Sequence, residues 1–187
     1  MTAAYIALLI LVGIERLGEV AVSRRNQRRM GEQGIQKIRE PHFPWLVMFH
    51  AVVLVAAGLE VLLFHRPLIP ALAVSMLALF ILSNLIRYWV IALLGGLWNI
   101  QIMDSSRVGF VTSGPYRWIR HPNYVGVVLE VFSLPLIHTA WITAIVGTLG
   151  YMEILRRRVS IEDRTLMANP AYREAMGSKA KFIPGIF

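Results

Sequence analysis

Two apolar stretches of membrane-spanning length constrain this chain more than any other feature of its sequence. Residues 43–64 and 68–94 are almost uninterrupted runs of apolar side chains, and an α-helix needs about 20 such residues to cross the hydrocarbon core of a bilayer. Because no water reaches that core, each segment must satisfy its own backbone N–H and C=O groups, as a helix does. The two stretches therefore predict membrane-spanning helices.

Three further apolar segments accompany these two. Residues 2–22 are long enough to span alone, whereas residues 123–137 and 140–155 are short and are separated by His138 and Thr139. Pro135 lies near the end of the fourth segment, so we expect the last two segments to form a short helical hairpin. The sequence thus predicts an all-α integral membrane protein with about five transmembrane helices.

The chain is expected to form one membrane domain over residues 1–187, because it contains no repeat or low-complexity segment. Residues 1–94 hold the three amino-terminal helices. The character of the chain changes near Gly95, after which residues 95–187 are richer in polar side chains. We therefore expect the chemistry to reside in this carboxyl half.

Composition supports the membrane assignment and argues against nucleic-acid binding and cysteine chemistry. Hydrophobic residues make up 56% of the 187 residues and charged residues only 16%, which is unlike a soluble domain. The net charge of +8 does not indicate a nucleic-acid partner, because the basic residues alternate with spanning-length apolar runs. Cysteine is absent, which excludes disulfides, thiolate metal sites and cysteine nucleophiles.

The distribution of lysine and arginine predicts the topology. Basic residues cluster in the first loop, the third loop and the carboxyl-terminal tail, and Arg66 alone lies in an outer loop. The first loop holds Arg24, Arg25, Arg28, Arg29, Lys37 and Arg39, and the third holds Arg107, Arg117 and Arg120. Because basic loops stay in the cytoplasm, we expect a multi-pass protein with its amino terminus outside and its carboxyl terminus inside.

Residues 114–126 combine aromatic, cationic and turn-forming residues between two apolar segments. An aromatic belt at headgroup depth does not require two prolines, an Arg-His pair and a glycine turn in so short a stretch. A backbone broken twice by proline is suited to line a cavity at the membrane surface. The stretch therefore predicts a cytoplasmic binding site with donors and ring faces from Tyr116, Arg117, Arg120, His121, Asn123 and Tyr124.

Charged residues also occur within the apolar segments. Glu15 and Glu19 share one helix face with Arg16 beside them, so an internal ion pair is expected, and substrate contact is the alternative. Arg87 is expected to pair or to extend toward the membrane surface.

The remaining polar candidates are histidines and one i,i+4 pair. His42 and His50 are read as interfacial or satisfied histidines, and no metal site is expected, because neither HExxH nor a histidine and carboxylate set occurs. Arg158 and Glu162 share a helix face. They either form a simple ion pair or place an anion-binding cation beside a carboxylate that binds hydroxyl groups or cations.

The carboxyl half carries a set of spaced motifs within residues 98–187. They are Gln101, the run 110–114, Tyr116, the block 120–126, Arg158, Glu162, Tyr172 and the closing Ile183-Pro184-Gly185. On these residues the chain resembles the isoprenylcysteine carboxyl methyltransferase family, which methylates lipid-like acceptors in membranes with S-adenosylmethionine. In the amino half, Glu15-Arg16 and Arg24-Arg25-Asn26 resemble a bacterial branch that methylates alkylpyrones or alkylresorcinols.

This resemblance implies roles for individual residues. Arg158 would meet the acceptor, and the cofactor would be held by Gln101, Val108, Gly109, Phe110, Val111, Tyr116, His121, Pro122, Asn123, Tyr124 and Glu162. Two positions depart from the family pattern. Val108 stands where many relatives carry histidine, and Asp163 follows Glu162 where they often carry a second glutamate.

The function implied is that of an integral membrane, S-adenosylmethionine-dependent O-methyltransferase. Its acceptor would be a lipophilic small molecule, like isoprenylcysteine carboxylate or like an alkylpyrone or alkylresorcinol, embedded among membrane lipids. Alternatives are a phospholipid N-methyltransferase, a reductase of the steroid 5-alpha type and a non-enzymatic membrane scaffold. In the reductases a glutamate directly follows the His-Pro-x-Tyr-x-Gly motif, whereas Val127 follows it here.

Overall fold

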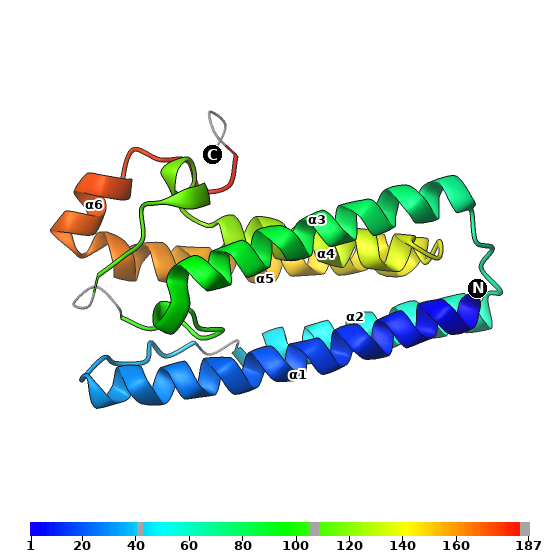
Figure 1. The fold of residues 1–187 in the computed structure, drawn as a ribbon, viewed down its shortest axis with the longest axis horizontal. Helices are drawn as coiled ribbons and strands as arrows, with labels where there is room; N and C mark the ends of the chain where they lie inside the picture. The colour runs from blue at the N-terminus through cyan, green and yellow to red at the C-terminus, as the bar shows by residue number, and fades with distance from the viewer. Residues whose placement is uncertain (41–42, 105–108, 184–187) are drawn as a thin grey trace.

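Five long helices, and three short helical segments near one end, build the part of the chain that the structure describes (Figure 1). The computed structural model describes residues 1–40, 43–104 and 109–183. Within these ranges there is no strand, only the isolated bridges Lys37–Met103 and Ile119–Ala180, and the predicted all-α class is confirmed. The helices are α1 (Thr2–Glu32), α2 (Phe43–Leu63), α3 (Pro70–Leu94), η1 (Gly95–Leu97), η3 (Gly114–Arg117), α4 (Pro122–Leu136), α5 (Trp141–Met167) and α6 (Pro170–Met176).

The long helices lie roughly along one axis. Figure 1 shows α1 and α2 side by side, with α3, α4 and α5 forming the other part of the bundle. Helix α3 packs along α4, α4 packs on α5, and α2 contacts α5. The amino terminus lies at one end of the bundle, whereas η3, α6 and the described carboxyl end gather at the other. This second end carries the short helical segments of the carboxyl half.

Two apolar clusters hold the helices together. One, near the amino terminus, includes Tyr5, Leu9, Val61 and Leu134. The other is centred on α4 and α5 and is built from Leu46, Tyr124, Val127, Val131, Tyr151, Leu155 and Val159. Many other large apolar side chains point outward along the helices, which is the pattern of a surface that contacts lipid.

Two of the described helices have the length and composition of a membrane span. They are Phe43–Leu63 and the continuous stretch Pro70–Leu97. Helix α4 is apolar but shorter, as expected from its sequence. It joins α5 through a tight connection in which Thr139 has a positive φ of 55°. The predicted hairpin of the last two segments is therefore present.

Two helix ends differ from the sequence prediction. Helix α1 does not end at residue 22 but continues to Glu32, so Arg24, Arg25, Arg28 and Arg29 lie on a helix and not in a loop. Helix α5 likewise continues from residue 155 to Met167 and carries Arg158 and Glu162 with it. The physical reason is that arginine, glutamine and glutamate favour helix, so a loss of hydrophobicity ends the apolar run without ending the helix.

Candidate active site

One cavity of about 240 Å³ collects residues from α1 through α6. Most of the site residues that the sequence predicted, and that the structure describes, line this cavity. They are Gln101, Gly109, Phe110, Val111, Tyr116, His121, Asn123, Tyr124, Arg158 and Glu162. Pro122 does not line the cavity, because it is buried at the first turn of α4. Val108, His42, Arg107, Pro184 and Gly185 lie outside the described residues.

The start of α4 positions three of these side chains. Pro122 occupies the first turn, where its missing N–H costs no helical hydrogen bond and its fixed φ favours the helix. The helix therefore begins at Pro122 with His121 as its N-cap, and His121, Asn123 and Tyr124 lie at the cavity wall. Gly126 follows one turn later, where a Cβ would lie only 2.6 Å from Cγ of Arg87. Glycine at this position lets α3 approach α4 closely.

Tyr124 joins the two charged residues that share a face of α5. Arg158 Nε donates to the Tyr124 hydroxyl at 2.6 Å, and this hydroxyl donates to Glu162 Oε2 at 2.5 Å. The Arg158 guanidinium also lies 5.7 Å from the centre of the Tyr124 ring. Arg158 and Glu162 are therefore connected through a phenol, and the simple i,i+4 ion pair is not the arrangement found.

Glu40 is the partner of Arg158 that sequence analysis missed. Arg158 Nη1 lies 2.9 Å from Glu40 Oε2, while Glu40 Oε1 accepts a hydrogen bond from the Ile102 amide at 2.6 Å. Arg158 Nη2 donates to the carbonyl oxygen of Ile100. Burial alone would lower the pKa of Arg158, but Tyr124, Glu40 and Glu162 raise it above its ordinary value. The guanidinium therefore stays charged at the cavity wall.

Asp163 ties the carboxyl-terminal segment to the start of α4. Its carboxylate lies 2.8 Å from His121 Nε2, 3.2 Å from Arg120 Nη1 and 3.2 Å from Lys181 Nζ. The backbone amide of Arg120 also donates to the carbonyl of Ala180 at 2.9 Å. Burial would raise the pKa of Asp163, but the His121 hydrogen bond and the nearby cations hold it below its ordinary value.

Aromatic rings and unpaired polar atoms occupy the same end of the cavity. Phe110 and Tyr172 meet edge to face, with ring centres 5.2 Å apart. Burial raises the pKa of Tyr116, so its hydroxyl remains a neutral donor and acceptor. Trp98 Nε1 and Asn123 Oδ1 are buried without a hydrogen-bond partner among the described residues. A bound molecule that offers an acceptor to Trp98 Nε1 and a donor to Asn123 Oδ1 would satisfy both atoms.

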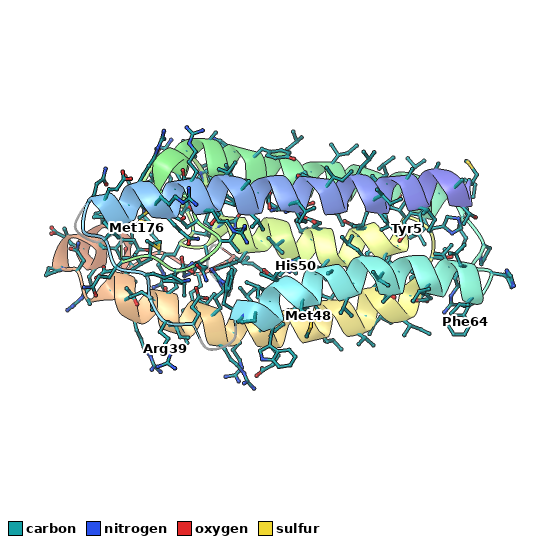
Figure 2. All side chains as sticks on the ribbon, turned by 90° about the horizontal axis from the view of Figure 1, so that it is seen from below. Tyr5, Arg39, Met48, His50, Phe64 and Met176 are labelled. Carbon is teal, nitrogen blue, oxygen red and sulfur yellow. The ribbon has the colours of Figure 1, made fainter. Side chains whose placement is uncertain are left out.

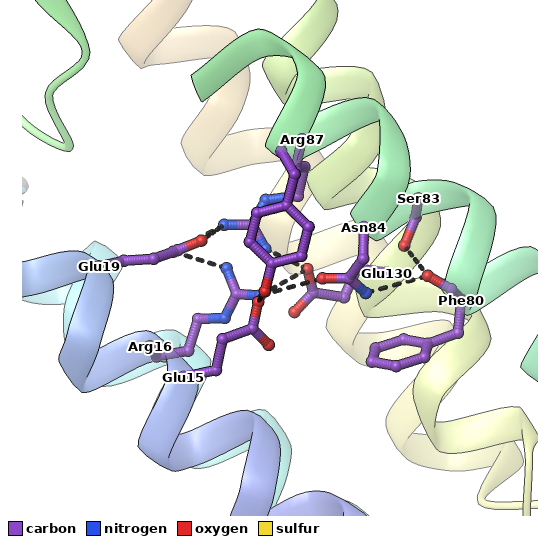
Figure 3. Close-up of polar contacts among 9 residues, drawn as sticks. Glu15, Arg16, Glu19, Phe80, Ser83, Asn84, Arg87 and Glu130 are labelled. Atoms are coloured by element: carbon purple, nitrogen blue, oxygen red, sulfur yellow. Dashed lines mark hydrogen bonds and ion pairs between the residues drawn. The ribbon is translucent and has the colours of Figure 1, made fainter. Parts of the chain in front are cut away.

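A charged network borders the other end of the cavity, between α1, α3 and α4 (Figure 3). Arg87 contacts Glu130 at 2.5 Å and Glu19 at 2.6 Å, and Arg16 contacts Glu19 at 2.7 Å. The expected ion pair of α1 is thus present, with two partners that the sequence spacing did not reveal. Arg16, Glu19 and Arg87 also line the cavity, so the network faces its interior.

His50 lines the cavity from α2, one turn beyond Leu46 and Val47. Its Nδ1 lies 2.9 Å from the carbonyl oxygen of Leu46, one turn earlier on the same helix. Its ring packs edge to face with Tyr151 at 5.4 Å. No group of three or more histidine or acidic residues within the described ranges is arranged to hold a metal ion. His50 is therefore a histidine of the cavity wall whose Nδ1 is satisfied by the Leu46 carbonyl.

Known proteins resemble this chain. YpbQ of Bacillus subtilis (strain 168), an uncharacterized protein, is 34% identical over 160 residues, which are 85% of this chain and 94% of YpbQ. An uncharacterized protein of Haemophilus influenzae is 30% identical over 91 residues, 48% of this chain and 53% of the relative. The sequence profile of the isoprenylcysteine carboxyl methyltransferase (ICMT) family matches residues 76–168.

A solved structure has a similar fold. It is that of the eukaryotic intramembrane Ras methyltransferase ICMT, which this chain matches with a TM-score of 0.59 and 25% sequence identity. The match covers 76% of this chain and 53% of the ICMT chain, so this chain spans about half the length of that protein.

Proposed function

This chain belongs to the isoprenylcysteine carboxyl methyltransferase family of membrane methyltransferases, and from this membership we propose that it transfers a methyl group from S-adenosylmethionine to an oxygen atom of a lipophilic acceptor. The acceptor resembles either an isoprenylcysteine carboxylate or an alkylpyrone or alkylresorcinol. The cofactor site faces the cytoplasm, in line with the basic residues around it.

The observation that carries this proposal is that a single cavity has a polar, aromatic end and an end between apolar helices. Phe110, Tyr116 and Glu162 line the first end. Val20, Val47 and Leu94 line the second, beside the charged network of Arg16, Glu19 and Arg87. A water-soluble cofactor and a lipophilic acceptor have opposite solvation requirements, and one cavity of this kind accommodates both. Arg158 lines the same cavity.

The residues at the polar end fit S-adenosylmethionine. When bound, this cofactor supplies an electrophilic methyl group on a positively charged sulfur. The carboxylate of Glu162 favours a bound positive charge. The ring faces of Phe110, Tyr116 and Tyr172 also favour a positive charge and can stack on a bound ring. The unpaired Trp98 Nε1 can donate to a carboxylate, and the unpaired Asn123 Oδ1 can accept from an amine or hydroxyl. Cofactor binding would thus remove two unsatisfied buried polar atoms.

Arg158 orients the acceptor oxygen in this proposal. Its Nε and Nη2 donate to Tyr124 and Ile100, whereas Nη1 faces Glu40 without a well-aligned hydrogen bond. The guanidinium therefore retains N–H groups for a substrate oxygen. Because Glu40 and Tyr124 hold it in place, it meets a developing or existing negative charge without reorganising.

The rival activities differ in what they require of this cavity. An amine acceptor, as in phospholipid N-methylation, would meet the buried positive charge of Arg158, which disfavours a cationic substrate. A nicotinamide-dependent reductase would need a dinucleotide site. A scaffold would not require a cavity with unpaired buried donors and acceptors.

Calorimetry on the purified protein tests this function. We expect saturable binding of S-adenosylmethionine and none of NADPH, followed by transfer of isotopically labelled methyl groups into lipid extracts. The product should be stable as an ester or ether of a lipophilic compound. Binding of NADPH alone, or labelling of an amine, would replace the proposed function with one of its rivals.

A further inference from the structure

His50 lines the cavity, and one of its ring nitrogens has no hydrogen-bond partner among the described residues. Its Nδ1 lies 2.9 Å from the carbonyl of Leu46, and since a carbonyl only accepts, Nδ1 carries the proton. In the neutral ring the lone pair is then on Nε2. Among the described residues Nε2 has no hydrogen-bond partner, although His50 lines the cavity. Figure 2 shows His50 midway between the end of the bundle with Tyr5 and the end with Met176.

The ring is held in one orientation. The Leu46 carbonyl fixes its Nδ1 edge, and Tyr151 packs against it at an interplanar angle of 79°. Phe49 contacts the ring from the neighbouring position on α2 with a centre distance of 6.0 Å. Because these contacts restrict χ1 and χ2, Nε2 points in a defined direction, as a hydrogen-bond acceptor for a substrate must.

Charged groups of every neighbouring helix face this histidine. Arg16 of α1 and Arg158 of α5 line the same cavity as His50, and a positive charge on the ring is opposed by other positive charges nearby. Arg87 of α3 and Glu19 of α1 line the same cavity and are paired with each other at 2.6 Å. A proton on His50 would therefore be held only transiently, as suits a group that accepts and then releases it.

We propose that His50 is a catalytic residue which accepts the proton of the substrate, and that the acceptor is a lipophilic phenol or enol. This inference rests on the proposed methyl transfer and specifies its acceptor class. A lone pair of the hydroxyl oxygen forms the new O–CH3 bond, and the S–CH3 bond breaks with its electrons remaining on sulfur. The hydroxyl proton moves to Nε2 and later to water. A carboxylate acceptor is already ionised and needs no such base.

Two probe acceptors and one matched pair of variants test this inference. The probes are a long-chain alkylresorcinol and N-acetyl-S-farnesylcysteine, which present a phenol and a carboxylate. The variants are His50→Gln and the control His65→Asn, which alters an exposed histidine of positive φ outside the cavity. Single turnover with saturating S-adenosylmethionine measures the rate.

We expect His50→Gln to slow methylation of the alkylresorcinol by about 100-fold to 10,000-fold at pH 7, the usual effect of a general base. The loss should shrink as the pH approaches the phenol pKa of about 10, because the phenolate needs no base. His65→Asn should retain the wild-type rate. An unchanged rate in His50→Gln, or methylation of the farnesylcysteine alone by wild type, overturns the inference.

A second measurement does not depend on turnover. In protein labelled with ¹⁵N-histidine, the Nε2 resonance of His50 is identified by its loss in His50→Gln. We expect the alkylresorcinol to shift this resonance, and an unshifted resonance at saturating ligand contradicts the contact. Calorimetry separates the two proposals: failure to bind S-adenosylmethionine removes the proposed function, whereas cofactor binding with an inert His50 removes only this inference.

Discussion

Arg158 Nη1 lies 2.9 Å from Glu40 Oε2, and only 8% and 7% of these two side chains are exposed. The contact joins α5 to the segment that follows α1. Removing one member of a buried ion pair leaves the other uncompensated, at a cost of about 3–5 kcal/mol. Arg158 is therefore both a structural partner of Glu40 and a cation at the cavity wall, and experiments must separate the two roles.

Replacement of Arg158 should reduce methyl transfer more than it reduces cofactor binding. We expect Arg158→Lys to lower the single-turnover rate while keeping a charge opposite Glu40, because lysine lacks the planar fork. Arg158→Ala should raise the barrier by about 2–4 kcal/mol, as loss of an oxyanion donor does. The control is Arg157→Ala, the exposed neighbouring arginine on α5. A folded Arg158→Lys enzyme with the wild-type rate would contradict this role.

Glu162→Gln should weaken binding of S-adenosylmethionine and leave the fold intact. The carboxylate lines the cavity and accepts the Tyr124 hydroxyl at 2.5 Å, so it is held where it can meet the cofactor. We expect a loss of about 1.5–3 kcal/mol, the usual contribution of a hydrogen bond to a charged group. Glu153→Gln is the matched control, since Glu153 is an exposed carboxylate on the same helix. Equal affinities of the two variants in calorimetry would assign Glu162 to packing alone.

Asp163→Asn should destabilise the protein in a pH-dependent way. The folded pKa of Asp163 lies below its ordinary value, so its pairing contributes stability above the ordinary pKa of about 3.9. This stability is lost as the pH falls through the lowered folded pKa. We expect a deficit of about 1–3 kcal/mol at pH 6 that shrinks below pH 4. Thermal unfolding in detergent measures it, and a deficit that grows on acidification would contradict the assignment.

Gly126→Ala should loosen the contact between α3 and α4. A Cβ at this position would lie 2.6 Å from Cγ of Arg87 and 3.1 Å from the Ser83 carbonyl oxygen. Overpacking of this kind costs about 1–3 kcal/mol, and it would also displace the guanidinium from Glu130. Gly18→Ala is the control, because a Cβ there meets no atom within 4 Å and alanine favours helix. Comparable melting temperatures for the two variants would exclude a tight approach.

Labelling of single cysteines tests the topology in this cysteine-free chain. We expect Gln33→Cys, beyond α1, and Ser178→Cys, beyond α6, to react from the cytoplasm, because basic residues surround both. Phe64→Cys, at the opposite end of α2, should react from outside. Phe187, at the carboxyl terminus that is expected in the cytoplasm, lies outside the described residues. Reaction of Gln33→Cys and Ser178→Cys from opposite sides would require a different number of spans.

Local patterns were sufficient to predict the five long helices and many of the residues that line the cavity. Long apolar runs predict the helices because a membrane-spanning segment must satisfy its own backbone groups, whereas the placement of Pro122 in the first turn of α4 is known only from the structure. The ends of α1 and α5 were predicted too early, since hydropathy reports contact with lipid and not helix propensity. A helix continues wherever its residues favour it, in lipid or in water.

The sequence by itself determined the all-α class, the family and many of the side chains that line the cavity. Only the tertiary structure decided which of them meet: Glu40 reaches Arg158 from a distant segment, Tyr124 stands between Arg158 and Glu162, and Arg87 is clamped by Glu19 and Glu130. Spacing along a chain specifies neighbours on one helix. Contacts between helices depend on rotation and approach, which packing at positions such as Gly126 sets.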